Sequence, residues 1–122
     1  MIQKIVLFVS LFLSVFEVDA QENTASKQVT TFTINASPLD TSRKIWLYLP
    51  KEYATSTKKY PVIYMHDAQN LFDAKTSYIG EWNVDEKLDS LNAQVIVVGI
   101  EHGNEKRLEE LTPYKNEKYG GG

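Results

Sequence analysis

Two short apolar runs on either side of one amphipathic stretch constrain the fold of this chain most strongly. Residues 61–66 (PVIYMH) and 94–100 (QVIVVGI) are almost continuously apolar, which is typical of strands covered on both faces. Between them, residues 83–91 carry apolar side chains at the i, i+4 and i+7 spacing of a helix: Val84, Leu88 and Leu91. Asn83 suits the N-cap of that helix. The order predicts a βαβ unit with two parallel strands, the beginning of an α/β sheet.

Two further strands are predicted ahead of this unit. Residues 29–34 (VTTFTI) are β-branched or aromatic, and residues 37–40 (SPLD) are typical of a turn. Residues 43–49 alternate with period two, so that Trp46 and Tyr48 share one face and Ile45, Leu47 and Leu49 share the other. We therefore expect two leading strands, paired as in a hairpin, before the βαβ unit.

The first twenty residues have the layout of a secretory signal peptide. A short positive start is followed by about twelve mostly apolar residues, 5–16, and then by Val18 and Ala20 at the positions that a signal peptidase reads. A membrane-spanning helix needs about 20 residues, so an uncleaved anchor is the weaker alternative. We predict cleavage after Ala20, a secreted or periplasmic location, and no stable membrane insertion after cleavage.

Composition limits the function of the remainder. The 122-residue chain has a net charge of −3, which leaves no electrostatic footprint for nucleic acid. It has no cysteine, which excludes a disulfide scaffold, thiolate zinc sites and cysteine nucleophiles. We expect residues 21–28 to form a disordered polar leader and residues 29–122 to form one domain.

Polar residues gather where the two apolar strands end. His66 and Asp67 follow one strand, and Glu101 and His102 follow the other. Ligands bind beyond the carboxyl ends of parallel strands, although strand ends are also simply where polarity begins. A metal site built from His66, Asp67, Asp73 and His102 would match no common ligand spacing, so we expect no metal.

A serine nucleophile is not evident from the residues themselves. A serine hydrolase of the α/β type presents its serine on a strained elbow, usually in a G-x-S-x-G motif. None of the serines after the signal segment has that context: Ser26, Ser37, Ser42, Ser56, Ser77 and Ser90.

Several sequence blocks nevertheless occur in the order of a known family. They are 45–50 (IWLYLP), 60–67 (YPVIYMHD), 82–91 (WNVDEKLDSL), 95–100 (VIVVGI), 107–113 (RLEELTP) and a glycine-bearing loop at 116–122. With these blocks the chain resembles the putative-esterase family of α/β-hydrolases, which includes enterochelin-esterase-like, feruloyl-esterase-like and esterase-D-like enzymes. The resemblance covers residues 29–122. It implies the N-terminal half of an α/β-hydrolase sheet, incomplete, with the nucleophile, acid and histidine located downstream of this chain.

The resemblance also implies roles for particular residues. The loop after the 61–66 strand would supply one oxyanion-hole N–H, from Ala68 or Gln69, with Asp67 shaping the turn. Many relatives have glycine where Ala68 stands. His66, which precedes the expected nucleophile, is better suited to a structural hydrogen bond than to the role of triad base.

Two further residues have open roles at this site. Trp82 is either a pocket wall or part of the core. Arg107 either faces an acidic substrate group or forms a salt bridge with Glu109, Glu110 or Asp67, and we favour the salt bridge. Together with His66 and Asp67, these two residues make up the expected pocket.

The function implied by the resemblance is that of an exported serine esterase that acts through an acyl-enzyme, without a cofactor. Its substrate would be a small-molecule ester or an ester linked to a polysaccharide. Because the triad would lie elsewhere, this chain alone would be inactive. The main alternative is a complete, non-catalytic exported binding module for carbohydrate or a similar ligand; a metal-dependent hydrolase is a weaker one.

Overall fold

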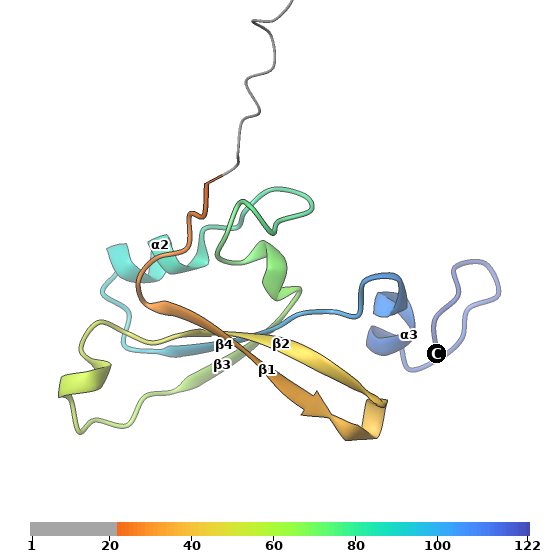
Figure 1. The fold of residues 1–122 in the computed structure, drawn as a ribbon, viewed down its shortest axis with the longest axis horizontal. Helices are drawn as coiled ribbons and strands as arrows, with labels where there is room; N and C mark the ends of the chain where they lie inside the picture. The colour runs from red at the N-terminus through yellow and green to blue at the C-terminus, as the bar shows by residue number, and fades with distance from the viewer. Residues whose placement is uncertain (1–21) are drawn as a thin grey trace, which may run out of the picture.

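The computed structural model describes residues 22–122, so the predicted signal peptide, residues 1–20, lies outside the described residues. The described chain forms one four-stranded mixed sheet with the strand order β1-β2-β4-β3 (Figure 1). The strands are β1 (Val29–Ala36), β2 (Thr41–Tyr48), β3 (Val62–His66) and β4 (Ile96–Ile100). All four predicted strands are therefore present.

Strands β1 and β2 form the expected antiparallel hairpin. Their register runs from Val29 opposite Tyr48 to Ala36 opposite Thr41. The connection is a short 3₁₀ turn, Ser37–Leu39, followed by Asp40 in the left-handed region at φ 48°. Aspartate tolerates this conformation better than most residues, which explains why the predicted turn can be so tight.

The predicted βαβ unit is also present. Strands β3 and β4 are parallel, with Val62 opposite Ile96, and they are joined through helix α2 (Val84–Ser90), which lies over one face of the sheet (Figure 1). Asn83 occupies the N-cap position, but its φ is 52° and its side chain makes no capping hydrogen bond. Leu91, which the helical spacing placed on the buried face, is 76% exposed because the helix ends before it.

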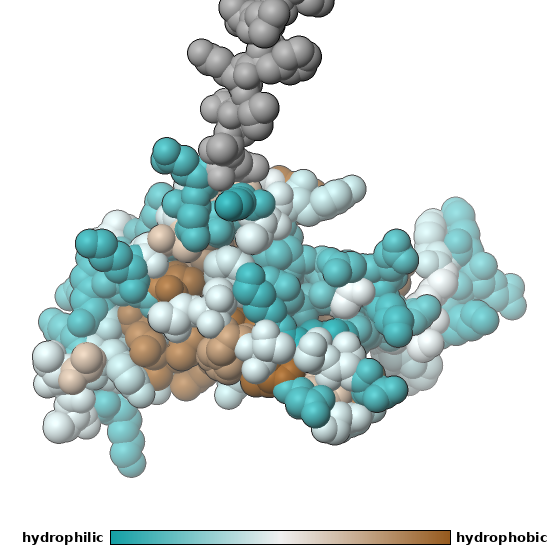
Figure 2. Space-filling view, viewed as in Figure 1, coloured by the Kyte–Doolittle hydropathy of each residue, from teal (hydrophilic) through white to brown (hydrophobic). Residues whose placement is uncertain are grey.

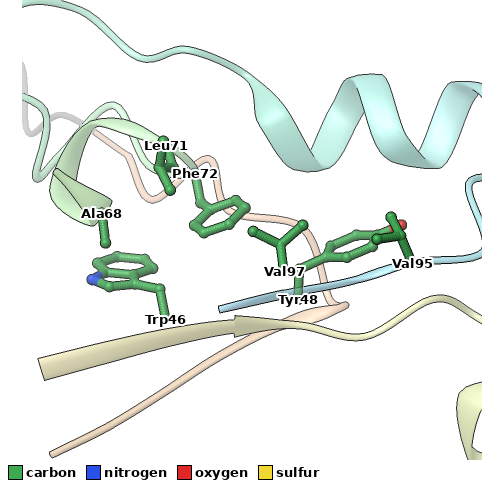
Figure 3. Packing of buried hydrophobic residues seen from close by; sticks show 7 residues of the cluster. All are labelled: Trp46, Tyr48, Ala68, Leu71, Phe72, Val95 and Val97. Atoms are coloured by element: carbon green, nitrogen blue, oxygen red, sulfur yellow. The ribbon is translucent and has the colours of Figure 1, made fainter. Parts of the chain in front are cut away.

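The hydrophobic core lies between the sheet, helix α2 and the loop that follows β3. Figure 3 shows its buried members, which are Trp46, Tyr48, Ala68, Leu71, Phe72, Val95 and Val97. Of the two predicted faces of β2, the face with Trp46 and Tyr48 is the one that meets the core. The Tyr48 hydroxyl donates to Asp89 Oδ1 at 2.9 Å, and burial together with the Asp89 carboxylate raises the pKa of Tyr48.

The β3 edge is largely exposed, whereas on the opposite face of the sheet Ile45 of β2 is only 4% exposed. Val62, Ile63 and Tyr64 are 44%, 47% and 71% exposed. Side chains of neighbouring strand residues point to opposite faces, so the expectation that this strand is covered on both faces is wrong for the described residues. In addition, β3 stands at the edge of the sheet and pairs only with β4. Figure 2 shows hydrophobic side chains gathered over the strands below helix α2.

The residues just before β1, which the sequence predicts to be a disordered leader, form hydrogen bonds to the rest of the domain. The Ser26 N–H donates to Asp85 Oδ2 at 2.7 Å, and Asp85 is fully buried. The Thr24 hydroxyl donates to Glu81 Oε2 at 2.6 Å, and the Thr24 N–H donates to Asp73 Oδ1 at 3.3 Å. Carboxylates that accept backbone N–H groups form strong, charge-assisted hydrogen bonds. These bonds attach residues 24–26, which we call the strap, to the rest of the domain.

The remaining helical elements outside the sheet are short. A 3₁₀ turn, Tyr53–Thr55, lies in the β2–β3 loop, and a turn at Asn104–Lys106 leads into helix α3 (Arg107–Leu111) after β4. A single bridge pairs Asn116 with Gly120 near the end of the chain. Within residues 22–122, no helix combines the length and the hydropathy needed to cross a membrane.

Candidate functional site

The carboxyl ends of β3 and β4 lie next to each other because the two strands are parallel and adjacent. His66 stands opposite Ile100, so Asp67 and His102 leave the sheet at the same edge. The His102 Nε2 atom is 4.0 Å from Asp67 Oδ1. Of the polar residues predicted at the two strand ends, Asp67 and His102 are therefore brought together. Glu101 is engaged in the scaffold, because its Oε1 accepts the Trp46 indole N–H at 2.7 Å.

Asp67 and Arg107 form a bidentate ion pair across this edge. Arg107 Nε donates to Asp67 Oδ1 at 2.8 Å and Nη2 donates to Oδ2 at 2.7 Å. The Arg107 hydrogen bonds hold the pKa of Asp67 below its ordinary value, outweighing burial, and the charges of Arg107, His102 and His66 lower it further. Of the two roles considered for Arg107, the salt bridge to Asp67 is the one present. It joins the loop after β3 to helix α3.

The chain turns sharply directly after β3. Asp67 is left-handed at φ 57° and ψ 41°, and it opens a 3₁₀ turn, η3 (Ala68–Asn70). The Asn70 N–H donates to the Asp67 carbonyl at 2.9 Å, and the Leu71 N–H donates to the Ala68 carbonyl at 3.2 Å. The N–H groups of Ala68 and Gln69 have no acceptor within residues 22–122, and the Asp67 side chain does not cap them. Two consecutive backbone donors are thus left unpaired at the strand end.

Turn η3 rests directly on strand β4 at Gly99. A Cβ placed on Gly99 would lie 2.9 Å from the Ala68 Cβ and 3.2 Å from Leu71 Cδ1. Ala68 and Leu71 are fully buried, and Figure 3 shows them above the sheet near Trp46. The missing side chain at Gly99 therefore lets the turn approach the sheet, and this contact sets the height of the two unpaired N–H groups.

Two buried polar side chains hold the rest of this loop. Asn70 is 6% exposed, and its Oδ1 accepts the Tyr78 N–H at 2.9 Å while its carbonyl accepts the Trp82 N–H at 2.8 Å. Asp73 is 3% exposed, and its Oδ1 accepts the Lys75 N–H at 2.9 Å. Sequence reasoning assigned Asn70 no role and considered Asp73 only as a metal ligand. Asn and Asp close to turns often bond to backbone N–H groups, which is the signal that could have identified them.

A pocket of about 760 Å³ opens beside turn η3, within the usual size range for small-molecule sites. It is lined by Gln69, Thr76, Ser77, Tyr78, His102, Asn104, Glu105 and Arg107. The pocket thus contains Gln69 and Arg107 from the predicted set. Among the other predicted residues, His66 is exposed and does not line it.

Trp82 also lies outside this pocket and outside the buried core cluster. It is 38% exposed. The core role considered for Trp82 is therefore not seen in the described residues, and its role as a pocket wall stays a prediction.

Within residues 22–122, no three histidine, cysteine, aspartate or glutamate side chains come together as a metal site. None of the serines in the same range stands at a turn from a strand into an α-helix: Ser42 lies in β2, Ser90 lies in α2, and Ser77 lies in the loop after turn η3.

Comparison with known proteins identifies the family. The family described as Putative esterase matches residues 36–120. The chain belongs to the Putative esterase family. The uncharacterized protein YbbA of Bacillus subtilis is 32% identical over 73 residues, which are 60% of this chain and 27% of that protein.

Two solved structures share the fold. An IroE-like serine hydrolase from Shewanella oneidensis has 26% identity and a TM-score of 0.58, over 72% of this chain and 27% of that one. The BES protein from Bacillus cereus has 18% identity and a TM-score of 0.59, over 83% of this chain and 40% of that one. The predicted fold class, the N-terminal part of an α/β-hydrolase sheet, is confirmed. The chain spans about a quarter of the length of YbbA and of the IroE-like hydrolase.

Proposed function

We propose that this protein is an exported carboxylic ester hydrolase of the serine type, and that turn η3 supplies part of its oxyanion hole. The observation that carries the proposal is the pair of unpaired N–H groups on Ala68 and Gln69 at the carboxyl end of β3. In α/β-hydrolases, the loop after this strand contributes an N–H to the oxyanion hole. Membership of the Putative esterase family, and similarity to a protein described as a serine hydrolase, support the same chemistry.

The chemistry proposed for this site is acyl transfer in two steps. A serine Oγ attacks the ester carbonyl while a histidine takes the serine proton, and the carbonyl oxygen becomes an oxyanion. The C–O bond to the alcohol then breaks, the alcohol takes that proton, and water releases the acid from the acyl-enzyme. The N–H groups of Ala68 and Gln69 would donate to the oxyanion. One such donor is typically worth a factor of about 10²–10³ in rate.

We further propose that the serine, acid and histidine of the triad come from residues outside this 122-residue chain. The chain covers 27% and 40% of its two structural relatives. None of its serines within residues 22–122 has the required position on a strand-to-helix turn. On this proposal, the isolated chain binds no acyl group covalently and has no esterase activity.

The N-terminal segment supports a secreted or periplasmic location for the enzyme, because residues 1–20 have the layout of a cleaved signal peptide. Export favours esters that occur outside the cytoplasm, either small molecules or acyl groups linked to polysaccharides. The pocket of about 760 Å³ beside Gln69 is within the usual size range for binding a small molecule, and so could hold the acyl group of such an ester.

A serine-directed fluorophosphonate applied to the full-length protein tests the proposed function. We expect hydrolysis of p-nitrophenyl acetate, loss of that activity on labelling, and a single labelled serine that maps outside residues 22–122. A labelled serine within this range would contradict the proposed location of the triad. Absence of both labelling and turnover would favour the alternative of a non-catalytic binding module.

A further inference from the structure

The Asp67–Arg107 ion pair lies one residue from the two unpaired N–H groups, close enough to affect whether the Asp67 carboxylate accepts one of them. An aspartate at the start of a helical turn ordinarily accepts the N–H of the second or third residue of that turn. For Asp67 these residues are Gln69 and Asn70. The Asn70 N–H is already bonded to the Asp67 carbonyl, so Gln69 carries the donor that the carboxylate would take.

Arg107 holds both oxygens of that carboxylate. Its Nε and Nη2 atoms bond to Oδ1 and Oδ2, one nitrogen to each oxygen, at 2.8 and 2.7 Å. The Asp67 side chain is only 16% exposed, and it makes no hydrogen bond to its own turn. Arginine is suited to this task, because its planar fork matches both carboxylate oxygens at once.

The backbone of Asp67 has a left-handed conformation, which differs from that of an ordinary N-cap residue. Its φ of 57° lies in the left-handed region, which is less favourable than the extended region for any residue with a side chain. In the extended region, an N-cap aspartate turns its carboxylate onto the N–H groups of the next residues. The left-handed backbone and the bidentate pair occur together, with no hydrogen bond from the turn to the Asp67 carboxylate.

We propose that Arg107 is a positioning residue that keeps the Gln69 N–H available by holding the Asp67 carboxylate away from it. Without the guanidinium, the carboxylate bonds to the Gln69 N–H, and a donor needed for the oxyanion is lost. A negative charge then also faces the developing oxyanion. This inference rests on the proposed oxyanion role of turn η3 for its effect on catalysis, but the state of the Gln69 N–H can be measured without catalysis.

The test compares four variants of the full-length protein. Arg107→Ala is expected to lower kcat for p-nitrophenyl acetate on the order of 10²-fold with a smaller change in KM, as for the loss of one oxyanion donor. Adding Asp67→Gly, which removes the competing acceptor and suits the left-handed backbone, is expected to restore kcat to within about tenfold of wild type. Adding Asp67→Asn instead leaves an acceptor that is also a good N-cap, so kcat stays low. Arg43→Ala removes another ion pair, with Glu110, and leaves kcat near wild type.

If the ion pair has only a structural role, a different pattern of kcat values is expected among the variants. If Arg107→Ala acts only by leaving a buried charge without a partner, Asp67→Asn removes that charge and rescues activity as well as Asp67→Gly does. That result would overturn the proposal. Equal loss of activity in Arg43→Ala and Arg107→Ala would overturn it as well.

Site-resolved hydrogen exchange separates this inference from the proposed function. The Gln69 amide is expected to exchange quickly in wild type and in Arg107→Ala/Asp67→Gly, and to be protected in Arg107→Ala and Arg107→Ala/Asp67→Asn. If wild type has no esterase activity, the proposed function fails while this exchange pattern still decides the role of Arg107. Unchanged exchange at Gln69 across the four proteins would refute the inference even in an active enzyme.

Discussion

Substitution of Gly99 by alanine should disturb the candidate site through a single methyl group. The added Cβ would lie 2.9 Å from the Ala68 Cβ, 3.2 Å from Leu71 Cδ1 and 3.4 Å from Phe72 Cε2. Carbon atoms pack best about 3.5–4.0 Å apart, so the added Cβ would push turn η3 away from strand β4 by up to about 1 Å. The neighbours cannot yield easily, because Ala68, Leu71 and Phe72 are all fully buried.

The magnitude follows from two opposing effects. Overpacking a core by one methyl group costs about 1–3 kcal/mol, whereas replacing glycine within a strand gains about 0.5–1 kcal/mol of backbone entropy. The net expectation is a loss of about 1 kcal/mol in the free energy of unfolding, between limits of about 0 and about 2.5 kcal/mol. The displacement also moves the Ala68 N–H, so kcat should fall together with stability in Gly99→Ala.

Denaturant unfolding and ester hydrolysis on the full-length protein measure both effects. Ala68→Gly removes the atom that clashes, so Gly99→Ala/Ala68→Gly should be more stable than the sum of the single changes predicts, with a coupling of about 0.5–3 kcal/mol. Ala68→Gly alone is the matched control for the loss of the methyl group. A Gly99→Ala protein within about 0.5 kcal/mol of wild type and with full activity would refute the reasoning, as would strictly additive effects.

Asp85→Ala leaves the Ser26 N–H without its buried acceptor, so the free energy of unfolding should fall by about 1–3 kcal/mol and proteolysis should release the strap; an unchanged midpoint and a protected strap would contradict this. Because the pKa of Asp67 is lowered in the folded protein, its ion pair stabilises the fold fully at pH values above the ordinary pKa of 3.8. This stabilisation is lost as the pH falls through the lower pKa of the folded state. The stability advantage of wild type over Asp67→Asn should therefore shrink on acidification, and a difference independent of pH would exclude this linkage. The isolated segment 21–122 should self-associate through the exposed β3 edge, and Tyr64→Lys should reduce this in light scattering, whereas a monomeric parent segment would disprove it.

The sheet could be predicted from the sequence because its signals are local. The alternation of 43–49 and the apolar runs of 61–66 and 94–100 each define one strand without information from elsewhere in the chain. The exposure of β3 could not be predicted in this way. A continuous apolar run reports that a strand can be buried on both faces, but burial depends on which segments pack beside it.

The candidate site was predictable only in part. The position of Asp67 and His102 follows from the parallel pairing of their strands, and the partner of Arg107 was among three expected carboxylates. The contacts of Thr24 and Ser26 with acidic residues 49 to 59 positions away leave no local pattern. The unpaired state of the Gln69 N–H is likewise a property of the folded turn and not of any short motif.

The central claim is that turn η3 donates backbone N–H groups to the oxyanion of an ester-hydrolysis intermediate. The most direct measurement is the amide spectrum of the full-length protein before and after reaction with a phosphonate inhibitor that mimics this intermediate. Our account predicts large downfield shifts for the amide protons of Ala68 and Gln69 in the adduct, because both become hydrogen-bonded to the phosphonyl oxygen. A fully labelled protein in which these two protons do not shift would contradict it.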